Sequence, residues 1–238
     1  MRNYKRIVIY ETFHEIMRII IINQIRGVLK LKQQQFNKVL KFFTILWAFT
    51  AVGLAIGTVI PPALVMPISI VTLVLLVLMM FSRTMRRMGR IISIIVATLT
   101  GITMFSLLNF YLGTLGGGLV LLIFGTTAVI FIVAGLVGYF MKKDLSSWGN
   151  ILFIILIGMV VFSVIAIFVN FSSFVWVIVS GLGVILFTVY TIFDMNQVAK
   201  NPIADEDVPM IALNLYLDFI NLFQNLLRFV YNLKEYLK

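Results

Sequence analysis

Residues 190–228 read YTIFDMNQVAKNPIADEDVPMIALNLYLDFINLFQNLLR, and this stretch holds two aspartates inside apolar sequence, Asp194 and Asp218. Around Asp218, polar residues recur at steps of four and three positions, which places them on one face of a helix. These residues are Asn214, Asp218, Asn221, Asn225 and Arg228. A carboxylate within an otherwise apolar membrane helix is costly, so both aspartates are candidate functional residues.

The composition is that of an integral membrane protein. Of 238 residues, 61% are hydrophobic and 12% are charged, and the mean hydropathy is +1.08. The chain has no cysteine and one histidine, His14, which excludes thiolate chemistry and a multi-histidine metal site. The net charge is +10. In a membrane protein, such a charge is better explained by cytoplasmic loops and contact with anionic lipid than by binding of nucleic acid. We expect no enzymatic activity and no cofactor.

The apolar sequence predicts an all-α membrane protein with seven transmembrane helices. Three long runs without charged residues each have room for two helices of about 20 residues, and each has a turn signal near its middle. A seventh apolar segment follows at about residues 209–231. The expected spans are residues 42–60, 63–82, 91–112, 119–140, 150–170, 174–200 and 209–231. We therefore divide the chain into a basic N-terminal segment (1–41), a membrane domain (42–231) and a short tail (232–238).

The N-terminal segment is open to two interpretations. Its apolar residues Ile9, Phe13, Ile16 and Ile20 have a spacing that suits an amphipathic helix on the membrane surface, in contact with anionic headgroups. A partly ordered cytoplasmic extension is the alternative.

Basic residues predict the orientation of the chain. Most of the nineteen Lys and Arg residues lie in the N-terminal segment and in the 83–90, 141–149 and 195–208 loops, which an odd number of spans puts on one side. The positive-inside rule places that side in the cytoplasm and the C-terminus outside. We expect a multi-pass protein of the cell membrane.

The two aspartates are expected to lie close together. Counted along their helices, Asp194 is roughly 9 Å and Asp218 roughly 13 Å from the cytoplasmic end, and the two helices are antiparallel neighbours. Two carboxylates within hydrogen-bond distance cannot both ionise cheaply and tend to share a proton. The alternatives are a solvated helix-end carboxylate for Asp194 and a structural role for Asp218.

Arg83, at the cytoplasmic end of the second span, is the natural counter-charge for Asp194. Its guanidinium can hold an ionised carboxylate and release it on protonation. The alternative is that Arg83 is one more positive-inside residue, like Arg86 and Arg87.

At these residues the chain resembles the transmembrane Bax inhibitor motif family, the Bax inhibitor-1-like proteins. The matching stretches are IPPALVMPISI (60–70), TGITMFSLL (100–108), FGTTAVIFIVAGLVGYFMKKDLSSWG (124–149), LFTVYTIFDMNQ (186–197) and IALNLYLDFINLFQNLLRF (211–229). The resemblance implies a fold of seven helices in which the seventh is central and surrounded by the other six.

The resemblance also implies a pH-sensitive calcium leak, with calcium as the permeant ion. Asp194 and Asp218 then match the proton sensor and offer transient contacts to calcium, and Arg83 matches a latch on Asp194. The polar face of the last helix, with Asn214, Asn221 and Asn225, is expected to serve helix packing as much as a polar path. One departure is that residues 63–82 lack the acidic residue that some members carry there; Thr72 is near the expected position.

Three other functions compete with a leak. A membrane adaptor or regulator of stress or protein quality control would act through membrane-protein partners without ion flux. A proton-coupled transporter is a further possibility. An intramembrane aspartyl protease also has two aspartates on consecutive helices, but Leu215-Tyr216-Leu217 stands where that family has Gly-x-Gly.

Overall fold

The computed structural model describes Arg18, Arg26 and residues 33–238, without the side chains of Met80, Phe81, Arg83 and Arg86. The expected surface helix of the N-terminal segment lies almost wholly outside the described residues. Within them the chain is helical, without strands, and seven helices are long and apolar enough to cross a membrane. The predicted fold class is confirmed.

The seven long helices follow the predicted order. The first runs from Gln33–Gly57, and the others are α2 (Val65–Phe81), α4 (Gly89–Leu115), α5 (Gly117–Phe140), α6 (Gly149–Phe168), α7 (Ser173–Lys200) and α8 (Val208–Tyr236). Three short elements connect them: η1 (Pro62–Leu64), α3 (Arg83–Arg87) and η2 (Ser146–Trp148).

The first helix begins well before residue 42, where the sequence predicted its start. Val39 and Phe42 are buried in the core, while Lys38 and Lys41 lie exposed on the other face. The two lysines interrupt the apolar run in the sequence but not the helix, because the helix buries one face only.

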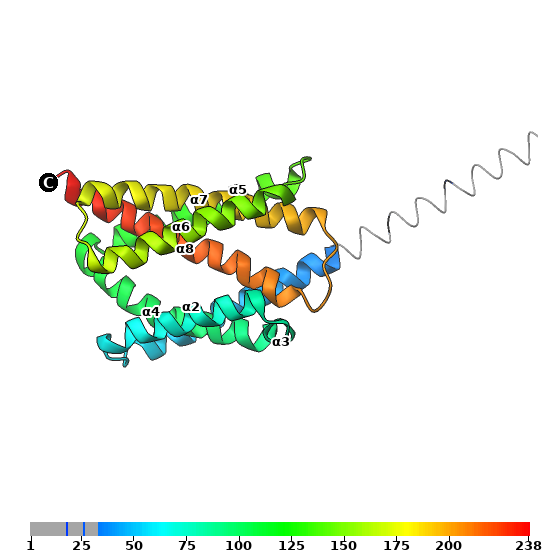
Figure 1. Cartoon of the computed structure of the whole chain (residues 1–238), viewed down its shortest axis with the longest axis horizontal. Helices are drawn as coiled ribbons and strands as arrows, with labels where there is room; N and C mark the ends of the chain where they lie inside the picture. The colour runs from blue at the N-terminus through cyan, green and yellow to red at the C-terminus, as the bar shows by residue number, and fades with distance from the viewer. Residues whose placement is uncertain (1–17, 19–25, 27–32) are drawn as a thin grey trace, which may run out of the picture.

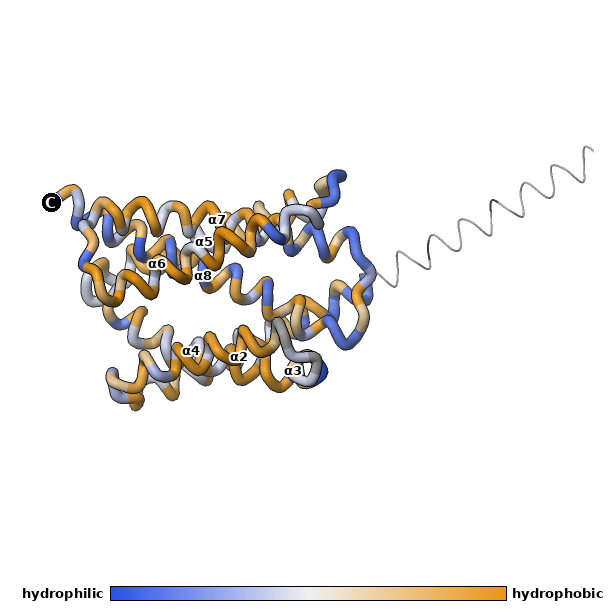
Figure 2. Tube along the Cα trace, in the orientation of Figure 1, coloured by the Kyte–Doolittle hydropathy of each residue, from blue (hydrophilic) through white to orange (hydrophobic). Residues whose placement is uncertain are grey.

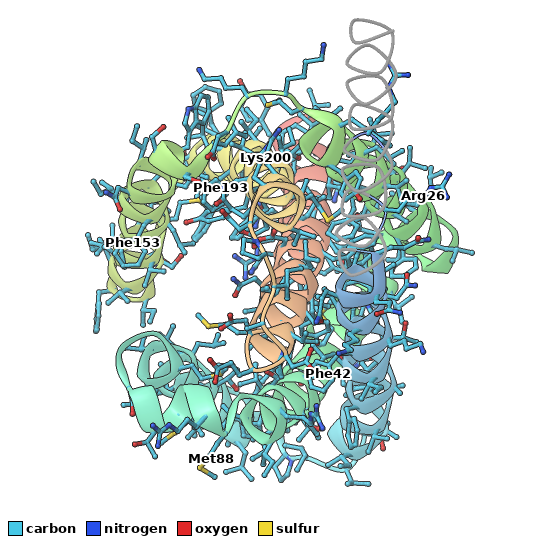
Figure 3. The ribbon with its side chains drawn as sticks, turned by 90° about the vertical axis from the view of Figure 1, so that its right-hand side faces the viewer. Arg26, Phe42, Met88, Phe153, Phe193 and Lys200 are labelled. Atoms are coloured by element: carbon cyan, nitrogen blue, oxygen red, sulfur yellow. The ribbon has the colours of Figure 1, made fainter. Side chains whose placement is uncertain are left out.

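The last helix, α8, is the centre of the bundle, as the family resemblance implied (Figure 3). It is the most buried of the seven and packs on α4, α5 and α7. The first helix also reaches it, through a 2.7 Å hydrogen bond between the hydroxyls of Thr50 and Tyr216 and an edge-on ring contact from Trp47. Of the outer helices, α2 packs mainly on α4 and α6 mainly on α7.

Glycines allow two pairs of helices to approach closely. A Cβ atom on Gly53 would overlap the Thr98 carbonyl of α4, and one on Gly138 would overlap the Ile192 carbonyl of α7. A turn of one residue, Gly116, joins α4 to α5 with a φ of 85°, a conformation that favours glycine. These contacts fix how the first helix sits on α4 and how α5 sits on α7.

The bundle has two distinct ends (Figure 1). The end that we call inner holds the start of the first helix, α3, and the 141–148 and 201–207 segments; the outer end holds the C-terminus. Hydrophilic residues gather at the inner end, whereas α2, α5 and α6 are mainly hydrophobic along their length (Figure 2). The basic segments 83–90, 141–149 and 195–208 therefore share one end with the start of the first helix.

Candidate functional site

Asp218 is a deeply buried carboxylate in the centre of the bundle. It lies on α8 with 5% of its surface exposed, and its Oδ2 atom is buried without a hydrogen-bond partner among the described residues. A buried charge without a partner is costly, and more so within a membrane. Because α8 is central, the ionised form of Asp218 needs a nearby cation, water or hydrogen-bond donor to stabilise it.

Asp194 lies on α7, the helix next to α8, and hydrogen-bond distance between its carboxylate and that of Asp218 stays a prediction. Asp194 is partly buried, and α7 is the helix that α8 contacts most extensively. The two carboxylates interact electrostatically with each other and with the Tyr190 phenol, which is one turn earlier on α7. The ion pairs within the described residues, Lys38–Asp205 and Lys238–Glu235, include neither aspartate.

The polar residues of α8 do not share one environment. Asn214 is exposed, and Asn221 is partly buried. Asn225 is buried, donates a 2.8 Å hydrogen bond to the backbone carbonyl of Asn221, and packs so closely on α7 that a Cβ on Gly183 would overlap its amide. Asn225 therefore contributes to the packing of α7 on α8, and its part in a polar path stays a prediction.

Arg83 is placed by its backbone alone. It begins α3, directly after Ser82, whose extended backbone ends α2. The side chain of Arg83 lies outside the described part of the structure, as does that of Arg86, so the latch on Asp194 stays a prediction.

Asn196, two residues after Asp194, forms a contact that the sequence analysis missed. Its fully buried amide accepts a hydrogen bond from the Leu145 N–H (2.9 Å) and donates to the carbonyls of Gly138 (3.2 Å) and Lys143 (3.0 Å). These groups belong to the end of α5 and the loop after it, where helical partners run out. Asn196 thus fastens the segment that carries Asp194 to α5, and only its place in the matched stretch 186–197 hinted at this.

Two carboxylates outside the spans are held ionised by hydrogen bonds. The hydroxyl and backbone N–H of Ser146 hold the pKa of Asp144 below its ordinary value. Lys38 and Gln35, at the inner end of the first helix, hydrogen-bond to Asp205 and hold its pKa below the ordinary value. Neither carboxylate belongs to the Asp194–Asp218 site.

A tight metal site is not part of this arrangement. Within the described residues, no group of three or more His, Cys, Asp or Glu side chains could hold a metal ion. Two carboxylates can still contact a passing hard cation, because calcium takes oxygen ligands and fills its remaining positions with water or carbonyls.

Comparisons with known proteins agree with the fold. Residues 32–235 match a family model described as inhibitor of apoptosis-promoting Bax1. The inner membrane protein YbhL of Escherichia coli K12 is 37% identical over 142 residues, which cover 56% of this chain and 58% of that protein. A protein of Helicobacter pylori J99 is 33% identical over 133 residues, 56% of each chain. An uncharacterized membrane protein of Streptococcus pyogenes is 32% identical over 143 residues, 58% of this chain and 60% of that one. The chain thus matches less than two thirds of the length of these relatives.

Proposed function

The chain belongs to the Bax inhibitor-1 family, and from that premise we propose that it is a pH-sensitive calcium leak of the cell membrane. In this proposal Asp194 and Asp218 sense protons and touch the passing calcium ion, and Arg83 latches Asp194 in the closed state. Anionic headgroups contact the basic N-terminal segment.

The buried pair of carboxylates on neighbouring helices is the observation that carries this proposal. Asp218 has an unpartnered Oδ2 in the centre of the bundle, and Asp194 is close enough to interact with it. Either a proton, a cation or water must compensate the charge of such a pair. Proton concentration and calcium therefore act on the same two groups, and protonation can bias a conformational equilibrium.

The polar path of the proposal is shorter than the spacing of the sequence suggested. Asn225 packs against Gly183, so the path uses Asp218, Asn221 and the exposed Asn214 toward the inner end. The absence of an acidic residue from α2 is consistent with a site that relies on the two aspartates alone for its negative charge.

Calcium flux into liposomes tests the proposal. The purified full chain is reconstituted with a trapped calcium indicator, and flux is compared at pH 8 and pH 6 with that of protein-free liposomes. We expect protein-dependent flux that rises at the lower pH. Folded, reconstituted chain without flux at either pH would overturn the leak and favour an adaptor role.

A further inference from the structure

An apolar cavity of about 390 Å³ lies on the far side of α8 from the aspartates. Ile220 and Phe223 of α8 line it, two and five residues from Asp218, and at 3.6 residues per turn they point away from that carboxylate. Its other walls come from Trp47 of the first helix, Met104 of α4 and Phe124 of α5. Sites for small molecules have volumes of about 300–1,000 Å³, so the cavity is large enough for a ligand.

Two polar side-chain atoms in the wall of this cavity, the Thr50 hydroxyl oxygen and the Met104 sulfur, already have partners. The hydroxyl of Thr50 donates to the Leu46 carbonyl (2.9 Å) and is hydrogen-bonded to the Tyr216 hydroxyl (2.7 Å), and the sulfur of Met104 accepts from the Gln224 amide (3.6 Å). The buried polar atoms left unpaired in the described residues belong to Gln35, Gln197 and Asp218, none of which lines the cavity. Buried water needs two to four polar partners. The cavity therefore suits a hydrocarbon and neither water nor an ion.

The mouth of the cavity opens on the surface that faces the bilayer. Among the lining residues, Leu121 is 71%, Leu112 47% and Phe124 39% exposed, and all belong to helices able to span a membrane. Leu112 and Gly117 are at the outer end, beside the Gly116 turn, while Met104 is roughly 12 Å further along α4 at 1.5 Å per residue. The cavity thus begins near the edge of the membrane and runs inward along the helices, as an acyl chain does.

We propose that this cavity binds one acyl chain of a membrane lipid, which enters from the leaflet at the outer end. The chain fills space that would otherwise leave the aromatic and aliphatic wall without contacts. It packs between the first helix and α5 and touches α8 on the face opposite Asp218. The proposal requires no ion flux and is independent of the proposed leak.

Quenching of Trp47 fluorescence by lipids with brominated acyl chains tests this site. Trp148→Phe and Trp176→Phe leave Trp47 as the single tryptophan of the full chain. This parent is reconstituted in phosphatidylcholine with or without bromine on the chains. We expect strong quenching in the parent and loss of most of it in Val120→Phe, because Val120 lines the cavity and the added ring takes the place of the chain.

Val133→Phe is the matched control. It places the same ring on the same helix at a residue that is 54% exposed and does not line the cavity, so we expect the quenching of the parent. Equal quenching in Val120→Phe and Val133→Phe would mean that bromine reaches Trp47 from the bulk lipid. That result, or an unquenched parent, would overturn the proposal; the latter would leave the cavity to another occupant, such as a second copy of the chain.

Thermal unfolding in detergent shows whether each variant is folded and whether added lipid stabilises it. A lipid that binds only the folded state raises the unfolding temperature. Added phosphatidylcholine should raise it for the parent and for Val133→Phe, and less for Val120→Phe or for a second filling variant, Leu108→Phe from α4. The same rise in all four proteins would contradict an acyl-chain site in this cavity.

Discussion

At the scale of single residues, Asp218 and Asp194 differ in what surrounds them. Asp218 is buried in the centre of the bundle with one oxygen unpartnered, whereas Asp194 is partly buried and lies near the inner end of α7. In the proposed leak, Asp194 is the member of the pair that the Arg83 guanidinium binds. The surroundings of the Asp218 carboxylate are set by the side chains of α7 and by any water or ion that binds beside it.

Asp218→Asn is expected to abolish the pH response of calcium flux. Asparagine keeps the size and hydrogen-bonding capacity of the side chain but cannot titrate. Flux through reconstituted protein at pH 8 and pH 6 measures the effect. Asn232→Ala, on the same helix but outside the proposed path, should keep the wild-type response. A proton response that survives in Asp218→Asn would mean that the pair is not the sensor.

Arg83→Ala should raise calcium flux at pH 8 toward the level that the wild-type chain shows near pH 6. In the proposed closed state Arg83 holds ionised Asp194, and loss of a charge-assisted hydrogen bond costs about 1–3 kcal/mol. About 1.4 kcal/mol is a tenfold change in the open-to-closed ratio. Arg86→Ala removes the same charge from the same short helix and should leave flux unchanged. Equal effects of both substitutions would indicate a general surface-charge effect.

How much of the site the sequence predicts is clear from the asparagines. The spacing of Asn214, Asn221 and Asn225 correctly indicates a shared helix face, since helical geometry fixes it. The spacing does not show which neighbouring helix covers each turn. The sequence therefore could not predict that Asn225 contacts Gly183 while Asn214 is exposed. The role of Asn196 was not predicted for a related reason. Its partners are backbone groups of α5 and the following loop, which are far away in the sequence.

At the scale of helices, three side chains hold the inner end of α7 to the neighbouring segments. Asn196 binds the end of α5, Ser146 donates to Gln197 (2.9 Å), and Lys200 donates to the Lys142 carbonyl (2.9 Å). By contrast, α2 packs mainly on α4 and buries little of its surface. The bonds of α7 hold the segment that carries Asp194 in place against α5 and the loop after it.

Gly138→Ala should destabilise the protein, because its Cβ would overlap the Ile192 carbonyl of α7. Overpacking of this kind costs about 1–3 kcal/mol. Gly125→Ala is the matched control in the same helix, since a Cβ there meets nothing within 4 Å. The control should be neutral or gain up to about 1 kcal/mol from helix propensity. Thermal unfolding in detergent compares the two variants, and equal stability would contradict the close α5–α7 packing.

The contact between Lys38 and Asp205 should stabilise the inner end in a pH-dependent way. Lys38 Nζ lies 2.7 Å from Asp205 Oδ1, and this bond holds the pKa of Asp205 below its ordinary value. A lowered pKa means stability that is present above the unfolded pKa and lost as pH falls through the folded one. Asp205→Asn should thus speed amide hydrogen exchange near Lys38 at pH 7, and the difference from wild type should vanish in acid. A difference independent of pH would contradict the ion pair.

At the scale of the whole molecule, the sequence predicts the number and order of the spans better than their ends. Long apolar runs with Pro and Gly between them are strong signals. The predicted start of the first helix, residue 42, was wrong because Lys38 and Lys41 occur within a helix whose other face is buried. Short α3 was missed because its five residues, RTMRR, carry no apolar period.

The two ends of the bundle lead to a prediction about its orientation. Lys142 lies in the segment after α5 at the inner end, and Lys238 follows α8 at the outer end (Figure 1). The chain has no cysteine of its own, so Lys142→Cys and Lys238→Cys each introduce one thiol. In intact cells an impermeant thiol reagent should label the Lys238→Cys chain only, because the positive-inside rule keeps the basic end in the cytoplasm. Permeabilised cells should label both. Labelling of both in intact cells would contradict seven spans, and labelling of Lys142→Cys alone would invert the orientation and place the carboxylate pair nearer the outside.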